Sequence, residues 1–149
     1  MVAPPLLKLP DEAAYRAHFE SVYCRGPVIT FDGIRVRIRK RDFDHCCFKT
    51  ERGTRRKTIF CRIRAERIDW IKAALEDPAA DLRVGWDNLR KQYAHDRRVA
   101  IVFGTYVVVI EIQRCGTKAE LITTYVADSG PGNTLNKLKK APKWRQKRT

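Results

Sequence analysis

The apolar positions near the start of the chain recur with a helical period. Between residues 11 and 25 they stand at spacings of i, i+4, i+7 and i+8 (Tyr15, Phe19, Val22 and Tyr23). This spacing predicts an amphipathic helix with Asp11 as its N-cap. The following Gly26-Pro27 pair predicts the end of the helix.

Strict alternation replaces the helical period between residues 28 and 39. Apolar Ile34, Val36 and Ile38 alternate with arginines (Arg35, Arg37 and Arg39), and Asp32-Gly33 precedes them. Asp-Gly between two β-rich runs is typical of a two-residue hairpin turn. The pattern therefore predicts a hairpin with one buried face and one face carrying three guanidinium groups.

Charge dominates residues 40–58, and we expect mainly a loop there. Helical spacing returns in the stretch "RIRAERIDWIKAALEDP", which begins at residue 62 and ends at Asp77-Pro78. Its apolar residues predict a second helix that ends before the proline (Ile63, Ile68, Ile71, Ala74 and Leu75).

The second half of the chain is rich in strand signals. A short strand is predicted at Leu82–Trp86, two β-rich runs flank Gly104-Thr105, and "KAELITTYVA" follows Gly116. We therefore predict an α+β fold: an N-terminal helix and hairpin, then a helix packed on a mainly antiparallel sheet of about four strands, and a basic C-terminal tail. The predicted organisation is an arm (1–10), one α+β domain (11–136) and the tail (137–149).

A net charge of +14 narrows the range of partners. The chain has 31 Lys and Arg residues against 17 Asp and Glu. Such an excess favours nucleic acid or an anionic membrane surface. The longest apolar run, Val99–Ile112, is interrupted and shorter than the ~20 residues that span a bilayer. We therefore expect a nucleic-acid partner, RNA first, and no membrane.

The location expected for the protein is the cytoplasm, either its own or that of a target cell into which it is delivered. The first ten residues contain prolines in place of the apolar core of a signal peptide. The five cysteines show no disulfide-framework spacing, which suits a reducing compartment.

The basic residues form the predicted nucleic-acid-binding set. Many phosphate contacts from such residues give salt-dependent binding, and a tryptophan among cations can stack on an unpaired base. The set comprises the strand arginines Arg35, Arg37 and Arg39, the run Arg55, Arg56 and Lys57, and the tail residues Lys139, Lys140 and Trp144.

No metal or cofactor is expected. Structural zinc sites usually space their thiolates as Cys-x₂₋₄-Cys, whereas Cys46 and Cys47 are adjacent. Small buried hydrophobic side chains are the simpler interpretation of this pair. His45 precedes them; from composition alone a half-buried, hydrogen-bonded histidine is favoured over a catalyst, although a neutral imidazole can serve as a base.

The order of these motifs resembles a known group. A histidine is followed by a basic stretch, "RIRAERIDWIKAALEDP", "VAIVFGTYVVVIEI" and "LITTYV". This order resembles the phage-associated nucleases of the barnase–EndoU–colicin–RelE-like fold, which occur on phage or mobile-element proteins or as toxin domains. The resemblance covers about residues 43–140. The doublet Cys46-Cys47 departs from the pattern, and residues 11–39 lie outside it.

The resemblance implies a helix followed by a four-stranded antiparallel sheet and metal-independent RNA cleavage. In that chemistry the 2′-OH attacks the adjacent phosphate, so a base, an acid and groups that stabilise the phosphorane are needed. His45 would be the general base or acid, and Arg62 or Arg64 would stabilise the phosphate. The last-strand polar groups would be Thr123 or Thr124, and Tyr125. For a toxin, an acidic immunity or inhibitor protein is a further expected partner.

Two other functions remain open at this point. One is a non-catalytic RNA- or DNA-binding module, and the other is a virion-associated structural protein whose charge faces packaged DNA. Binding alone requires neither His45 nor the strand hydroxyls.

Overall fold

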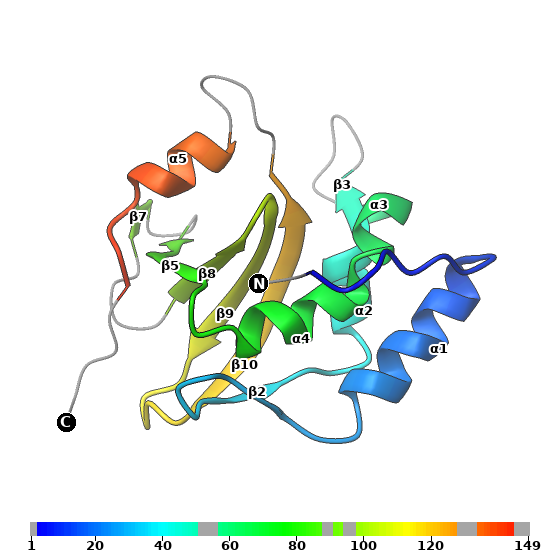
Figure 1. The fold of residues 1–149 in the computed structure, drawn as a ribbon, viewed down its shortest axis with the longest axis horizontal. Helices are drawn as coiled ribbons and strands as arrows, with labels where there is room; N and C mark the ends of the chain where they lie inside the picture. The colour runs from blue at the N-terminus through cyan, green and yellow to red at the C-terminus, as the bar shows by residue number, and fades with distance from the viewer. Residues whose placement is uncertain (1–2, 51–56, 88–90, 94–97, 128–133, 145–149) are drawn as a thin grey trace.

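A computed structural model describes residues 3–50, 57–87, 91–93, 98–127 and 134–144 of the chain. Figure 1 shows its arrangement. The helices are α1 (Glu12–Tyr23), α2 (Asp42–Cys47), α3 (Arg62–Ala65), α4 (Ile68–Glu76) and α5 (Thr134–Lys140). The strands are β1 (Val28–Ile29), β2 (Arg35–Arg37), β3 (Phe48–Thr50), β4 (Lys57–Phe60), β5 (Asp81–Val84), β6 (Trp86–Asp87), β7 (Gln92–Tyr93), β8 (Arg98–Phe103), β9 (Tyr106–Ile112) and β10 (Lys118–Val126).

The main sheet has six strands in the order β1-β2-β10-β9-β8-β5. All its neighbouring pairs are antiparallel except β2 and β10, which are parallel. The fold is therefore α+β, as predicted, but the expectation of about four strands is wrong. Strands β1 and β2 extend the β8–β9–β10 meander at its β10 edge. The parallel pairing of β2 with β10 is a long-range contact, and no local pattern in the sequence predicts it.

One face of the sheet carries the larger core. Helices α1, α2 and α4 contribute to it, and α4 lies across the sheet in Figure 1. Tyr23 joins two of these helices, because its buried hydroxyl donates a 2.6 Å hydrogen bond to the Ile68 carbonyl. A smaller apolar cluster lies on the sheet around Val107 and Val109, against which Leu138 of α5 packs.

Helix α1 matches the prediction, with the Asp11 carboxylate accepting a hydrogen bond from the Ala14 amide. The second predicted helix is divided into α3 and α4. Its first apolar residue, Ile63, is 56% exposed and lies outside the buried stripe of α4. The sequence pattern predicted one helix instead of two because Ile63 continues the helical spacing of the apolar residues in α4.

Strands β1 and β2 are connected by a turn that is longer than the predicted two residues. Residues 30–34 link them, and the Thr30 amide donates to the Ile34 carbonyl at 2.8 Å. The Thr30 hydroxyl accepts from the Ile34 amide at 2.9 Å and donates to the Asp32 carboxylate. These side-chain bonds add to a backbone bond from the Gly33 amide to the Thr30 carbonyl at 3.0 Å, and Gly33 supplies the positive φ of 88°.

Both ends of the described chain pack on the domain. In the N-terminal arm, the Leu7 amide donates to the Glu66 carbonyl, and the Pro4 carbonyl accepts from the Trp70 indole. Residues 141–144 run beside β5, where the Trp144 amide donates to Leu82. This contact covers a sheet edge that is otherwise open to pairing.

Candidate active site at the end of helix α2

His45 lies in the last turn of α2 and is exposed. The prediction of mainly loop at residues 40–58 is therefore wrong for residues 42–50, where α2 and β3 lie. Phe43, Cys46 and Cys47 are buried and stand at i, i+3 and i+4. This spacing is helical. The charged residues around it obscure the helical pattern when the whole stretch from 40 to 58 is considered.

Two threonines of β10 hold the end of α2. The Thr123 hydroxyl donates a 2.8 Å hydrogen bond to the His45 carbonyl, and the Thr124 hydroxyl donates at 3.3 Å to the Cys46 carbonyl. The last carbonyls of a helix have no partner within it, so these hydroxyls take the place of the missing amides. Strand β10 thereby fixes the position of the backbone that carries His45.

The next two carbonyls after those of His45 and Cys46 are also bound. The Cys61 amide donates to the Cys47 carbonyl at 2.7 Å, and Arg64 Nη1 donates to the Phe48 carbonyl at 3.0 Å. Segments from α3 and β10 therefore converge on one short stretch of chain. The bond to the Phe48 carbonyl places Arg64 in the candidate site.

Tyr125 and Arg64 lie near one another at this junction. Burial raises the pKa of Tyr125, and the positive charge of Arg64 opposes that rise. The phenol is therefore protonated at neutral pH and can donate a hydrogen bond. It is partly buried on the same side of the sheet as Val107 and Leu138.

A β-bulge changes which faces these side chains occupy. The register of β10 against β9 shifts between Leu121 and Thr123. Thr124 is fully buried, so it cannot touch a substrate, and its predicted direct catalytic role is wrong. Its hydroxyl positions α2 instead. Thr123 is only partly buried and remains a candidate.

The two candidate arginines have different surroundings. Arg62 faces the N-terminal arm, where its guanidinium donates to the Leu9 carbonyl at 2.8 Å and to the Pro10 carbonyl at 3.2 Å. It also lies 5.4 Å from the centre of the Tyr15 ring. These contacts give Arg62 a structural role, and Arg64 is the better candidate for a phosphate ligand.

The predicted nucleic-acid-binding residues are dispersed. Arg35 and Arg37 are exposed on β2, whereas Arg39 pairs with Glu120 at 2.7 Å. Lys139 and Lys140 are exposed at the end of α5. Arg55 and Arg56 lie outside the described residues, and of Lys57 only the backbone, in β4, is described.

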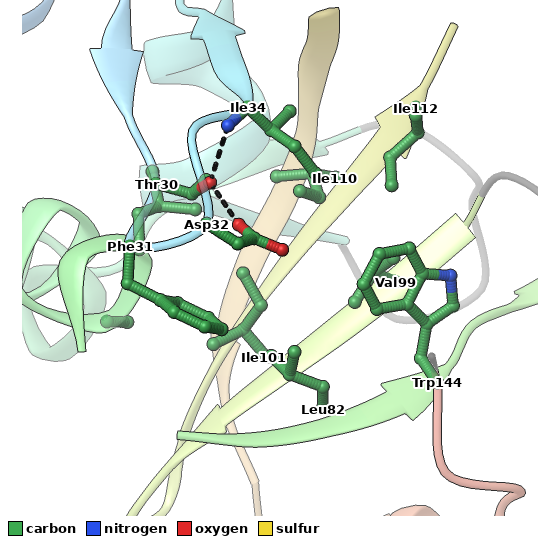
Figure 2. A pocket seen from close by; sticks show the side chains of 12 residues that line it. Thr30, Phe31, Asp32, Ile34, Leu82, Val99, Ile101, Ile110, Ile112 and Trp144 are labelled. Carbon is green, nitrogen blue, oxygen red and sulfur yellow. Dashed lines mark hydrogen bonds between the residues drawn. The ribbon is translucent and has the colours of Figure 1, made fainter. Parts of the chain in front are cut away.

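Trp144 is not available to bases. It is 9% exposed and belongs to the larger core. Figure 2 shows its indole beside Val99 in an apolar hollow below the β1–β2 turn. The hollow has a volume of about 10 Å³, roughly what one water molecule requires. The prediction that Trp144 stacks on a base is therefore wrong, since its ring serves as a core side chain.

Among the residues that the structure describes, no three His, Cys, Asp or Glu side chains are grouped as metal ligands. The described helices include none that is long and apolar enough to cross a bilayer. Cys46 and Cys47 are buried, and burial raises the pKa of the Cys47 thiol.

Comparisons with known proteins give no assignment: no family model, no curated protein and no solved structure matches the chain.

Proposed function

We propose that the protein is a metal-independent endoribonuclease whose site lies at the junction of α2, α3 and β10. The observation that supports this most directly is that Arg64 binds the turn after α2 and lies near a protonated Tyr125, while Thr123 of the same strand holds the His45 carbonyl. These are the residue types that phosphate transesterification needs: a base, an acid and a fixed cation.

In the proposed reaction the His45 imidazole accepts the proton of the RNA 2′-OH, whose oxygen attacks the adjacent phosphorus. The bond from phosphorus to the 5′-oxygen then breaks, leaving a 2′,3′-cyclic phosphate. Tyr125 gives a proton to the departing 5′-oxygen, and solvent restores both side chains. Arg64 stabilises the additional negative charge on the phosphorane.

The biological setting we propose is that of a phage or toxin effector acting on RNA in the cytoplasm. The net charge of +14 supports an RNA partner and, for a toxin, an acidic inhibitor protein that would associate rapidly with so basic a surface.

The experiment is incubation of the purified protein with total RNA in EDTA, beside His45→Ala and a catalytically remote control, Lys72→Gln on α4. We expect cleavage with 2′,3′-cyclic ends by the wild type and the control, and a loss of at least ~10²-fold in His45→Ala. Cleavage by His45→Ala at the wild-type rate would reject the assignment of His45.

A second candidate is a nucleic-acid-binding module without catalysis. It is favoured by the exposed Arg35 and Arg37, which lie on a strand that pairs with the opposite end of β10. This function predicts steeply salt-dependent binding and intact RNA after prolonged incubation.

A further inference from the structure

A cationic groove lies where β2 joins β10. It has a cavity volume of about 520 Å³, and its charged lining residues are Arg25, Arg35, Arg37 and Lys118. Among the described residues that line it, none is Asp or Glu. The groove therefore concentrates positive charge in a concave surface, which strengthens the attraction for an anion.

Three separate segments of sequence build this groove. Parallel pairing places Lys118 of β10 opposite Arg35 of β2. Val36 between the two strand arginines is fully buried in the core, so Arg35 and Arg37 point to the other face. Arg25 follows the end of α1 and completes the lining. Sequence inspection missed Arg25 and Lys118 because only the parallel pairing brings them to β2.

The four cations lack acidic partners in the described part of the chain. None of the ion pairs between described residues includes them. Glu120 of β10 stands opposite Arg37 of β2, but its carboxylate pairs with Arg39 at 2.7 Å. Like charges side by side on neighbouring strands repel one another, so an anion in the groove would relieve this repulsion.

Phosphates of a nucleic-acid strand suit the groove better than a membrane surface. Peripheral membrane binding combines cations with apolar side chains that insert into the bilayer. None of the large exposed apolar residues of the described chain lines this groove (Leu6, Val22, Ile29, Phe31, Ile59 and Ile63). The lining instead offers guanidinium and ammonium donors, which bind phosphate oxygens.

Strand β10 connects the groove with the candidate active site. Lys118 begins the strand, and Tyr125 stands seven residues later. At a strand rise of about 3.3 Å per residue the two are roughly 23 Å apart, a span of several nucleotides of single-stranded RNA. A single RNA strand can therefore reach from one to the other.

We infer that Arg25, Arg35, Arg37 and Lys118 form a subsite for the phosphates of an RNA strand, several nucleotides from the scissile phosphate at Arg64 and Tyr125. The spacing between the subsite and a scissile phosphate has meaning only under the proposed ribonuclease function. Phosphate binding by the four cations does not require that function. The subsite provides affinity, while the end of α2 provides the chemistry.

Fluorescence anisotropy with labelled single-stranded RNA tests the subsite. All proteins carry His45→Ala, so the RNA is not consumed. The test variant is Arg35→Gln/Arg37→Gln, and the control is Lys72→Gln/Lys91→Gln, which removes the same charge from exposed sites outside the groove. Thermal unfolding of each protein verifies folding, which these exposed substitutions should preserve.

Two lost contacts should reduce the slope of log affinity against log salt by about 1.4, since each contact to single-stranded nucleic acid contributes about 0.7. Between 50 and 200 mM salt the test variant should therefore lose roughly sevenfold less affinity than the parent protein. The control should keep the parent slope. The affinity of the parent protein should also rise with RNA length until the strand is long enough to reach both sites.

The outcomes separate this inference from the proposed function. Equal slopes for the test and control variants would overturn the subsite, whether or not the wild type cleaves RNA. A slope change without cleavage by wild type would keep the subsite and reject the ribonuclease. Arginine-dependent binding to phosphatidylserine vesicles, with no such dependence for RNA, would show a membrane site and overturn the inference.

Discussion

The Thr123 hydroxyl donates a 2.8 Å hydrogen bond to the backbone carbonyl of His45. This bond joins the last strand of the sheet to the last turn of α2, across 78 residues of sequence. The polar strand residue and the histidine are thus structurally coupled through the backbone. The hydroxyl therefore has a structural partner in the His45 backbone.

Replacing Thr123 with Val should therefore lower kcat more than it raises KM. The substitution removes one neutral hydrogen bond, worth about 1 kcal/mol, and so kcat should fall about fivefold if the position of His45 limits the reaction. Steady-state cleavage of a short RNA measures both constants.

Thr123→Ser provides the matched control, because serine keeps the hydroxyl. It should restore kcat to near the wild-type value. A rise in KM with unchanged kcat would instead assign Thr123 to substrate binding.

Substitution should show that Arg64 is needed for activity and that Arg62 is needed for stability. Arg64→Gln removes the cation next to Tyr125, and loss of one electrostatic stabiliser typically costs 10²–10³-fold in rate. Arg62→Gln should leave the rate nearly unchanged and lower the free energy of unfolding by about 1 kcal/mol, since it releases the arm carbonyls of Leu9 and Pro10.

Urea unfolding and RNA cleavage measured on both variants check this separation. If Arg62→Gln loses the activity and Arg64→Gln keeps it, Arg62 and not Arg64 is the phosphate ligand.

Local patterns predicted those parts of the fold that depend on local physics. Helix α1 and its Asp11 cap follow from periodicity and hydrogen bonding within one turn. The β8–β9 pair follows from two β-rich runs about Gly104, whose φ is 63°. Such features need no knowledge of distant residues.

Other parts depend on contacts between distant segments. The parallel pairing of β2 with β10 joins Arg35 to Lys118, and neither segment encodes its partner. Trp144 appeared as an exposed tail residue because its neighbours are basic, yet the open edge of β5 and the hollow at Val99 bury it. The register shift in β10 between Leu121 and Thr123 is likewise visible only in the pairing with β9.

Cys115 should be the most reactive thiol at neutral pH. It is exposed, and hydrogen bonds from Thr117, chiefly from its hydroxyl, lower the pKa of Cys115 to about 7. Because the thiolate is the nucleophile, alkylation by iodoacetamide should reach half its maximal rate near pH 7. Buried Cys47, whose pKa burial raises, should remain unmodified.

Peptide mass spectrometry after timed labelling measures both sites in one sample. Thr117→Ala should move the Cys115 profile toward the usual thiol pKa of about 8.5. An unchanged profile in that variant would show that the hydroxyl does not set the thiol pKa.

Tyr106 should make the folded protein sensitive to alkaline pH. Its side chain is fully buried, its hydroxyl has no hydrogen-bond partner among the described residues, and burial raises the pKa of Tyr106 well above 10.0. In the unfolded chain the phenol ionises near pH 10. Above that pH the unfolded state therefore binds fewer protons than the folded state, and stability falls as pH rises.

The contribution of one such group is about 1.4 kcal/mol per pH unit until the folded-state pKa is reached. Tyr23 adds a second contribution of the same sign, because burial also raises the pKa of Tyr23. The free energy of unfolding in urea should therefore decrease steeply from pH 10 to 11, and Tyr106→Phe should flatten this decrease by about one group's share. Val108→Ala, a buried and non-titrating control on the same strand, should lower stability by the same amount at every pH. Parallel pH profiles for Tyr106→Phe and the wild type would show that the phenol does not control the alkaline transition.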